Sequence, residues 1–153
     1  MVDFQTALTE RRCPLGGARL IERAVTNTAR LLRVARRYDV PVATCYTAYN
    51  SKRDMPHWKV TAVTEDLIDG HPSTQLDPRI YDSNYDVAMR KSGASIFFQT
   101  PALSFLGKER VDTVIVPGCV TSGCIRASLI DSFQWGFRTL VPVTRLAAPH
   151  QRP

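Results

Sequence analysis

The sequence predicts an α/β domain in which helices on both sides cover a mainly parallel central sheet, a three-layer αβα sandwich. Short apolar and β-branched runs alternate with segments of helical periodicity, an order typical of parallel sheets. Residues 111–117 are apolar almost throughout, as expected of a strand buried on both faces. The chain has 153 residues and no internal repeat, which fits one domain.

The first half is expected to hold one long helix and one strand. Residues 18–38 have helical spacing of apolar residues, and five arginines fall on the other side. Residues 41–46 are predicted to form a strand, because they are apolar or β-branched. The long mixed stretch of residues 50–78 is expected to be a loop, and such loops in small domains are often functional or mobile.

The second half is expected to alternate strands with helices. Residues 86–90 are predicted to form a strand, and residues 100–108 a helix with Pro101 in its first turn. The buried strand 111–117 then leads through a tight turn, residues 118–121, into a helix over residues 122–134. Gly136 suits the C-terminal cap of that helix. Residues 137–141 are predicted to form the last strand.

Composition limits the classes of function. Apolar residues make up 44% and charged residues 22%, as in ordinary soluble proteins. No apolar run approaches the roughly 18 residues of a membrane span, and no export signal is visible, so we expect a cytoplasmic protein without a membrane partner. The net charge of +6 would favour an anionic partner, but a solvated basic surface is the preferred explanation. No aromatic residues interleave with the arginines of residues 19–37, so no nucleic-acid partner is expected.

The cysteines and histidines do not form a pattern typical of disulfides or of metal sites. The four cysteines include no C-x-x-C pair, so no disulfide framework is expected. The three histidines are scattered and do not pair with a cysteine at ligand spacing, so no metal is expected.

The clearest chemical signal is in residues 118–128, where the buried strand passes through small residues into a helix. Cys124 is expected in the first helical turn, where free backbone N–H groups and the helix dipole would lower the pKa of its thiol. The same N–H groups can hold an oxyanion, and Gly123 lets a substrate approach the backbone. A small apolar core role fits Cys124 as well, and Cys119 at the strand end is interpreted as core.

The segment over residues 111–142 resembles the cysteine hydrolases of the isochorismatase-like superfamily, most of all the N-carbamoylsarcosine amidase and maleamate amidohydrolase group. The resemblance is carried by the Thr-Ser-Gly-Cys turn and then by Arg126-Ala, Asp131-Ser and Gly136-Phe-Arg. It implies that Cys124 is the nucleophile. It also implies a non-proline cis peptide between Val120 and Thr121 that helps to shape the oxyanion hole.

Two further matches extend the resemblance to most of the chain. Lys91, in Arg-Lys-Ser-Gly-Ala-Ser-Ile-Phe-Phe-Gln-Thr, resembles the family lysine that ends a strand. The match implies that its ammonium stabilises the thiolate. Asp3, in Val-Asp-Phe-Gln, resembles the family D-x-Q turn and would exchange protons with the nucleophile and the leaving amine. Taken alone, such a lysine would face solvent and an aspartate at position 3 would belong to a frayed terminus.

The resemblance implies a hydrolase that cleaves the C–N bond of a small linear amide or ureido acid, releases ammonia through a thioester, and needs no cofactor. Metal-dependent relatives carry Asp-x-His where this chain has Tyr-Thr-Ala-Tyr, so no metal is implied. Tyr46 and Trp58 are candidates for substrate binding. The resemblance also implies a homo-oligomer.

Both ends of the chain differ from the family pattern. Only Met1 and Val2 precede Asp3, where the family has an apolar strand, and residues 143–153 match nothing in the family. We therefore expect a hydrolase domain over residues 1–142, truncated at both ends, and a divergent tail over residues 143–153. The alternative is a catalytically impaired family member that acts as a subunit or binding protein.

Overall fold

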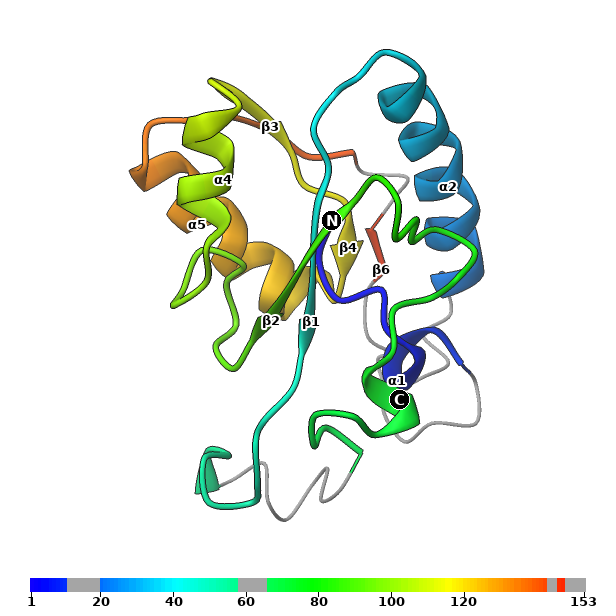
Figure 1. Ribbon diagram of the computed structural model, residues 1–153, viewed down its shortest axis with the longest axis vertical. Helices are drawn as coiled ribbons and strands as arrows, with labels where there is room; N and C mark the ends of the chain where they lie inside the picture. The colour runs from blue at the N-terminus through cyan, green and yellow to red at the C-terminus, as the bar shows by residue number, and fades with distance from the viewer. Residues whose placement is uncertain (11–19, 58–65, 143–145, 148–153) are drawn as a thin grey trace.

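The strand pairs of the sheet are all parallel in the part of the chain that the structure describes (Figure 1). The computed structural model describes residues 1–10, 20–57, 66–142 and 146–147. In these residues the strands pair as β1 (Ala43–Thr47) with β2 (Val87–Lys91), β3 (Thr113–Ile115) with β5 (Arg138–Leu140), and β4 (Gly118–Cys119) with β6 (Leu146–Ala147).

The start of the chain joins two of these pairs. Val2 makes parallel bridges to Cys45 of β1 and to Gly118 of β4. The N–H of Val2 donates to the carbonyl of Pro117 at 2.9 Å, and its own carbonyl accepts the N–H of Cys119 at 3.0 Å. Val2 therefore lies between β1 and β4 and links the β1–β2 pair to the β4–β6 pair, while β3 and β5 form a ladder of their own.

Helices cover both faces of this sheet. Helix α2 (Ile21–Arg37) lies on one side of β1, and α4 (Ala102–Lys108) and α5 (Arg126–Gln134) lie on the other (Figure 1). One apolar cluster joins α2 to the sheet, and its members include Phe4, Ile21, Ala24, Val25, Leu32 and Val42. A second cluster joins α4 to the opposite face, and its members include Val2, Met89, Ile96, Phe97, Leu106 and Val116. The predicted αβα layering is confirmed.

Helix α2 confirms the predicted amphipathic pattern. Ile21, Ala24, Val25, Thr28 and Leu32 are buried, whereas the arginines at positions 23, 30, 33 and 37 are exposed. Arg36 differs from the other arginines, because its guanidinium forms a two-pronged ion pair with Asp86 at 2.6 and 3.1 Å. The same guanidinium donates to the carbonyl of Ile80 at 2.7 Å and so fixes the end of α2 to the loop before β2.

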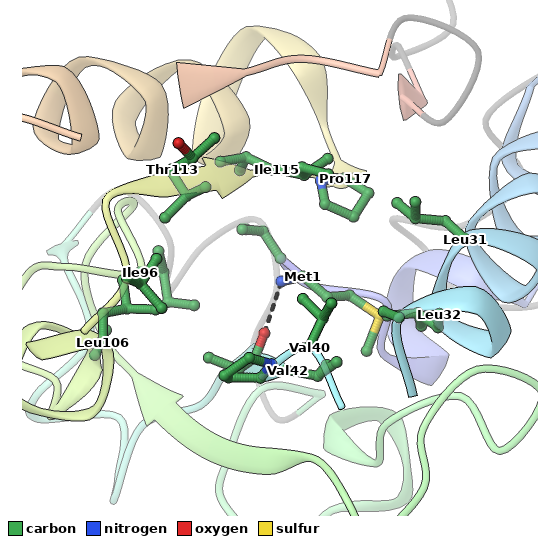
Figure 2. A pocket seen from close by; sticks show the side chains of 18 of the residues that line it. Met1, Leu31, Leu32, Val40, Val42, Ile96, Leu106, Thr113, Ile115 and Pro117 are labelled. Carbon is green, nitrogen blue, oxygen red and sulfur yellow. Dashed lines mark hydrogen bonds between the residues drawn. The ribbon is translucent and has the colours of Figure 1, made fainter. Parts of the chain in front are cut away.

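The apolar segment 111–117 differs from its prediction. It forms only the short strand β3, and it is not buried on both faces, since Ile115 is 46% exposed. The reason is tertiary: β3 pairs with β5 along one edge, but along the other it lines a cavity (Figure 2). An apolar run indicates that a segment is suited to burial. It does not indicate whether neighbouring strands or helices are present to bury it.

The predicted helix over residues 122–134 begins differently from an ordinary α-helix. Its first turn, η2 (Thr121–Ile125), is π-helical, and the N–H of Ile125 reaches back to the carbonyl of Val120 at 3.4 Å. Helix α5 follows without a break, and Gly136 after its end has φ +84°, as its predicted capping role requires.

The remaining elements are short. Helix α1 (Thr6–Thr9) comes shortly after the Val2 bridges, and the 3₁₀ turn η1 (Pro72–Thr74) lies in the long predicted loop. Among the described residues, the helices are too short or too polar for any of them to cross a bilayer.

Candidate active site

The fold brings Asp3, Lys91 and Cys124 together from three distant parts of the chain. The Nζ of Lys91 lies 2.8 Å from Oδ2 of Asp3 and 3.5 Å from Sγ of Cys124. Asp3 follows the Val2 bridge, Lys91 is the last residue of β2, and Cys124 lies in the η2 turn after β4. All three therefore lie at the carboxyl ends of parallel strands, where open α/β sheets commonly place their ligands.

Asp3 is held rigidly. It is 1% exposed and has a left-handed backbone, φ 53°. Its N–H donates to the carbonyl of Cys45 at 3.0 Å, and its carbonyl accepts the Cys119 thiol at 3.0 Å. Asp3 is therefore not part of a frayed terminus, as its position taken alone would suggest, because its neighbour Val2 is fixed between two strands.

Thr47 is a member of the cluster that the sequence did not single out. Its Oγ1 accepts a hydrogen bond from Lys91 Nζ at 2.7 Å and donates to Asp3 Oδ1 at 3.3 Å. The side chain of Gln5 fixes the Thr47 backbone, since Oε1 accepts its N–H at 2.7 Å and Nε2 donates to its carbonyl at 3.1 Å. The available signal for Thr47 was its position at the carboxyl end of a predicted parallel strand. The available signal for Gln5 was its place in the D-x-Q match.

The environment of Lys91 keeps its ammonium charged. Burial alone would lower the pKa of Lys91, but the Asp3 carboxylate and the nearby thiols outweigh burial and hold the pKa above its ordinary value. Nζ also donates to the carbonyl of Gly93 at 3.1 Å. Lys91 can therefore supply a fixed positive charge at neutral pH, and it is unsuited to accept a proton.

The thiol of Cys124 is shifted in the direction opposite to the sequence prediction. Burial raises its pKa most, Asp3 raises it further, and Lys91 lowers it by less, so that the pKa lies at about 12. The predicted lowering is wrong for this site, because it considered the helix start and Lys91 without the burial and the carboxylate beside the thiol. Cys124 is thus a protonated thiol with a carboxylate in reach of its proton.

The turn around Cys124 also differs from prediction in its backbone. The cis peptide lies between Cys119 and Val120, one bond before the predicted Val120–Thr121 bond. No proline marks the bond in the sequence, so its position depended on the register of the resemblance alone. Gly123 was expected to let a substrate approach the backbone, and its N–H donates to the carbonyl of Val120 at 3.0 Å.

Ser128, which the sequence reasoning missed, anchors this turn. Its Oγ donates to the carbonyl of Cys124 at 2.7 Å and accepts the N–H of Ile96 at 3.0 Å. The turn is thereby fixed to the segment that follows Lys91. A serine four residues after Cys124 lies on the same helical face, which was the only signal for this role.

Of the two residues predicted to bind substrate, Tyr46 is described by the structure and does not join the cluster. Tyr46 lies between Cys45 and Thr47, both of which contact Asp3, and neighbouring strand residues point to opposite faces. Burial raises the pKa of Tyr46 most, and the Asp69 carboxylate on that other face raises it further. The alternation of β1 thus takes Tyr46 away from the cluster. Trp58 lies outside the described residues.

No three histidine, cysteine, aspartate or glutamate side chains of the described residues group closely enough to hold a metal ion. The metal-free and cofactor-free site expected from the sequence stays a prediction.

Comparison with known proteins identifies the family. The isochorismatase domain profile matches residues 1–152. A maleamate amidohydrolase from Pseudomonas putida is 33% identical over 160 residues, which cover 100% of this chain and 73% of that protein. An N-carbamoylsarcosine amidase from an Arthrobacter species is 31% identical over 147 residues, which cover 92% of this chain and 55% of that protein.

Solved structures share the fold. A cysteine hydrolase from Pseudomonas syringae superposes with a TM-score of 0.90 at 23% identity, over 97% of this chain and 71% of that one. An N-carbamoylsarcosine amidase from Thermoplasma acidophilum superposes with a TM-score of 0.85 at 20% identity, over 98% of this chain and 83% of that one. The family resemblance seen in the sequence is confirmed: this chain belongs to the isochorismatase domain family, and several relatives named here bear the names of amide hydrolases.

Proposed function

We propose that this protein is a cysteine-dependent hydrolase that cleaves the C–N bond of a small linear amide or ureido acid and releases ammonia. The observation that carries the proposal is the contact of Lys91 Nζ with both Asp3 Oδ2 and Cys124 Sγ. A nucleophile, a proton acceptor and a fixed cation in one buried cluster are the groups that acyl transfer needs. Two relatives named for amide hydrolysis support the substrate class.

In the first half of the proposed reaction, Sγ of Cys124 attacks the substrate carbonyl while its proton passes to the Asp3 carboxylate. A thiol with a pKa of about 12 needs such a base, because almost none of it is ionised at neutral pH. The oxyanion is held by backbone N–H groups around Thr121 and Cys124. Lys91 offsets the negative charge as it moves from the carboxylate to the sulfur and the oxyanion.

In the second half, the tetrahedral intermediate collapses and the C–N bond breaks. Asp3 gives its proton to the departing nitrogen, which leaves as ammonia, and the acyl group remains on Cys124 as a thioester. Water then attacks the thioester carbonyl while Asp3 takes a proton from the water. The carboxylic acid product departs, and that proton returns to Sγ.

Ammonia release tests this proposal. The panel holds N-carbamoylsarcosine, maleamate and other small carbamoyl and amide acids, and the two proteins are the chain itself and Cys124→Ala. We expect release from at least one substrate and a loss of roughly 10⁴-fold or more in Cys124→Ala, as for other nucleophile deletions. Rapid quenching and intact mass measurement would show the acyl adduct on residue 124.

A panel on which both proteins are silent would overturn the proposal. If calorimetry then showed that the same acids bind, the alternative of a catalytically impaired binding protein would be favoured. Iodoacetamide labelling at neutral pH does not separate the two cases, because a thiol with a pKa of about 12 reacts slowly in either.

A further inference from the structure

The hydroxyl of Thr47 lies between the two charged side chains of the Cys124 cluster. An ammonium can only donate hydrogen bonds, whereas a hydroxyl can both accept and donate. Lys91 Nζ donates to Thr47 Oγ1 at 2.7 Å, so the single proton of that hydroxyl is left for Asp3 Oδ1, which lies 3.3 Å away. The chemistry of the groups therefore determines the direction of both hydrogen bonds, from the lysine to the hydroxyl and from the hydroxyl to the carboxylate.

The other two N–H groups of the Lys91 ammonium also have acceptors. They donate to the carbonyl of Gly93 at 3.1 Å and to Sγ of Cys124 at 3.5 Å. Oδ2 of Asp3 lies 2.8 Å from Nζ, where it feels the charge of the ammonium, but it accepts no hydrogen bond from any residue that the structure describes. A buried carboxylate oxygen without a donor is uncommon in proteins and is available to accept a proton.

The two oxygens of the Asp3 carboxylate therefore differ. Oδ1 accepts the Thr47 hydroxyl at 3.3 Å and the Cys45 thiol at 3.8 Å, whereas Oδ2 accepts neither. Oδ2 and the sulfur of Cys124 both contact the same Lys91 Nζ. A thiol with a pKa of about 12 gives up its proton only to a base placed beside it, and Oδ2 is the oxygen that is free to act as this base.

We propose that Thr47 is a positioning residue: its hydroxyl holds one N–H of Lys91 and one oxygen of Asp3, and thereby keeps the other carboxylate oxygen open for the thiol proton. This role rests on the proposed function, in which the carboxylate takes that proton. When the S–H bond of Cys124 breaks, an O–H bond forms on Oδ2. The N–H already directed at the sulfur then stabilises the thiolate, and the ammonium and the hydroxyl keep their own protons.

The rest of β1 and β2 fixes the place of this hydroxyl. Thr47 is buried, pairs with Lys91 in the register of the two strands, and has both backbone groups bonded to the side chain of Gln5. Without the hydroxyl, the released N–H of Lys91 has Oδ2 of Asp3, 2.8 Å away, as its nearest remaining acceptor. That oxygen would then hold a hydrogen bond and would be a poorer base for the thiol.

Thr47→Val removes the hydroxyl and keeps the shape of the side chain. We expect kcat for ammonia release to fall about 10–100-fold and KM to change by less than about twofold, because the hydroxyl acts through Lys91 and Asp3 and does not touch the substrate. Thr47→Ser restores a hydroxyl and should keep kcat within about threefold. Thr44→Val is the matched control on the same strand, because the buried Thr44 hydroxyl has no partner among the described residues. It should leave kcat unchanged.

Alkylation of the substrate-free protein gives a readout that needs no turnover. Once Oδ2 accepts the lysine N–H, the thiol loses its acceptor, and Thr47→Val should react with iodoacetamide at Cys124 at least about threefold faster at pH 8. Thr47→Ser and Thr44→Val should react at the rate of the unchanged chain. Hydrogen exchange of the β1 and β2 amides should be equal in all four proteins, as expected if the fold around the cluster is intact.

Full kcat in Thr47→Val, a loss that Thr47→Ser shares, or a change in KM alone would overturn the role of Thr47 and leave the proposed function standing. So would an alkylation rate in Thr47→Val equal to that of the unchanged chain, or faster hydrogen exchange confined to this variant. If the unchanged chain releases no ammonia from any acid of the panel, the proposed function fails instead. The alkylation rates then decide by themselves whether Thr47 positions the cluster.

Discussion

At the scale of single residues, the Asp3 carboxylate acts on Cys124 in two opposite ways. It raises the pKa of the thiol in the resting site and, in the proposed reaction, takes the thiol proton. We predict that Asp3→Asn abolishes ammonia release and yet makes Cys124 more reactive toward iodoacetamide at pH 8. The thiolate fraction rises roughly tenfold for each unit by which the pKa falls.

Mass spectrometry of the alkylated Cys124 peptide measures this rate. Asp112→Asn is the matched control, because Asp112 is exposed and distant from the cluster in the sheet. Asp112→Asn should change neither the rate of ammonia release nor the rate of Cys124 alkylation. If Asp3→Asn slowed alkylation, the carboxylate would not be what raises the pKa of the thiol.

The pKa of Cys124 also determines a pH profile. The reactive form is the thiolate, so a pKa raised to about 12 moves its appearance to higher pH. We predict that the alkylation rate of the substrate-free protein rises about tenfold per pH unit from pH 7 to pH 10 without levelling off. A plateau below pH 9 would contradict the raised pKa and would favour the thiolate that the sequence alone predicted.

At the scale of elements, Gly118 allows the start of the chain to lie against β4. It has φ +154°, and a Cβ at this position would lie 2.2 Å from the carbonyl oxygen of Val2. That oxygen is backbone held between two strands and cannot move aside. We predict that Gly118→Ala lowers the free energy of unfolding by more than about 3 kcal/mol, or prevents folding.

Gly136 provides the matched control. It too has positive φ, +84°, but a Cβ there would meet nothing within 4 Å. Gly136→Ala should therefore introduce only backbone strain, which lowers the free energy of unfolding measured in urea by about 1–2 kcal/mol. Equal losses in the two variants would show that conformation, and not the close contact with Val2, determines the need for glycine at position 118.

Arg36 ties α2 to the rest of the fold. Its partner Asp86 is fully buried in its side chain, so removal of the guanidinium leaves a carboxylate without its cation. We predict that Arg36→Met lowers the free energy of unfolding by about 3 kcal/mol, since broken buried pairs cost roughly 3–5 kcal/mol and Arg36 is partly exposed. Arg33→Met, on the exposed face of the same helix, should change it by less than about 0.5 kcal/mol. Urea unfolding of both variants is the measurement.

At the scale of the whole molecule, self-association and a cytoplasmic location stay predictions. Ile130 and Phe133 share a face of α5 and are 53% and 77% exposed, and Trp135 beyond the helix is 61% exposed. We expect sedimentation to show an assembly larger than one chain, and Phe133→Ser to shift it toward the single chain. Tyr38→Ser, at a similarly exposed aromatic residue that follows α2, is the control. A single chain at all concentrations would contradict the prediction.

The αβα class and the family could be predicted from the sequence because they depend on local patterns. Helical periodicity determined α2, and the Thr-Ser-Gly-Cys turn with its flanking matches indicated the family that the comparisons confirm. The burial of segment 111–117 could not be predicted in this way, because it depends on which neighbours its two edges find.

The sequence by itself determined which residue types carry the proposed chemistry, since a nucleophilic thiol, a lysine and an aspartate are each marked by short motifs. Only the tertiary structure decided their electrostatics. Parallel strands place Asp3 and Lys91 beside one partly buried sulfur, and burial together with the carboxylate outweighs the lysine, which reverses the expected shift of the Cys124 pKa. The effect of neighbouring charges on a pKa depends on their distances in space. Separation along the chain does not reveal those distances.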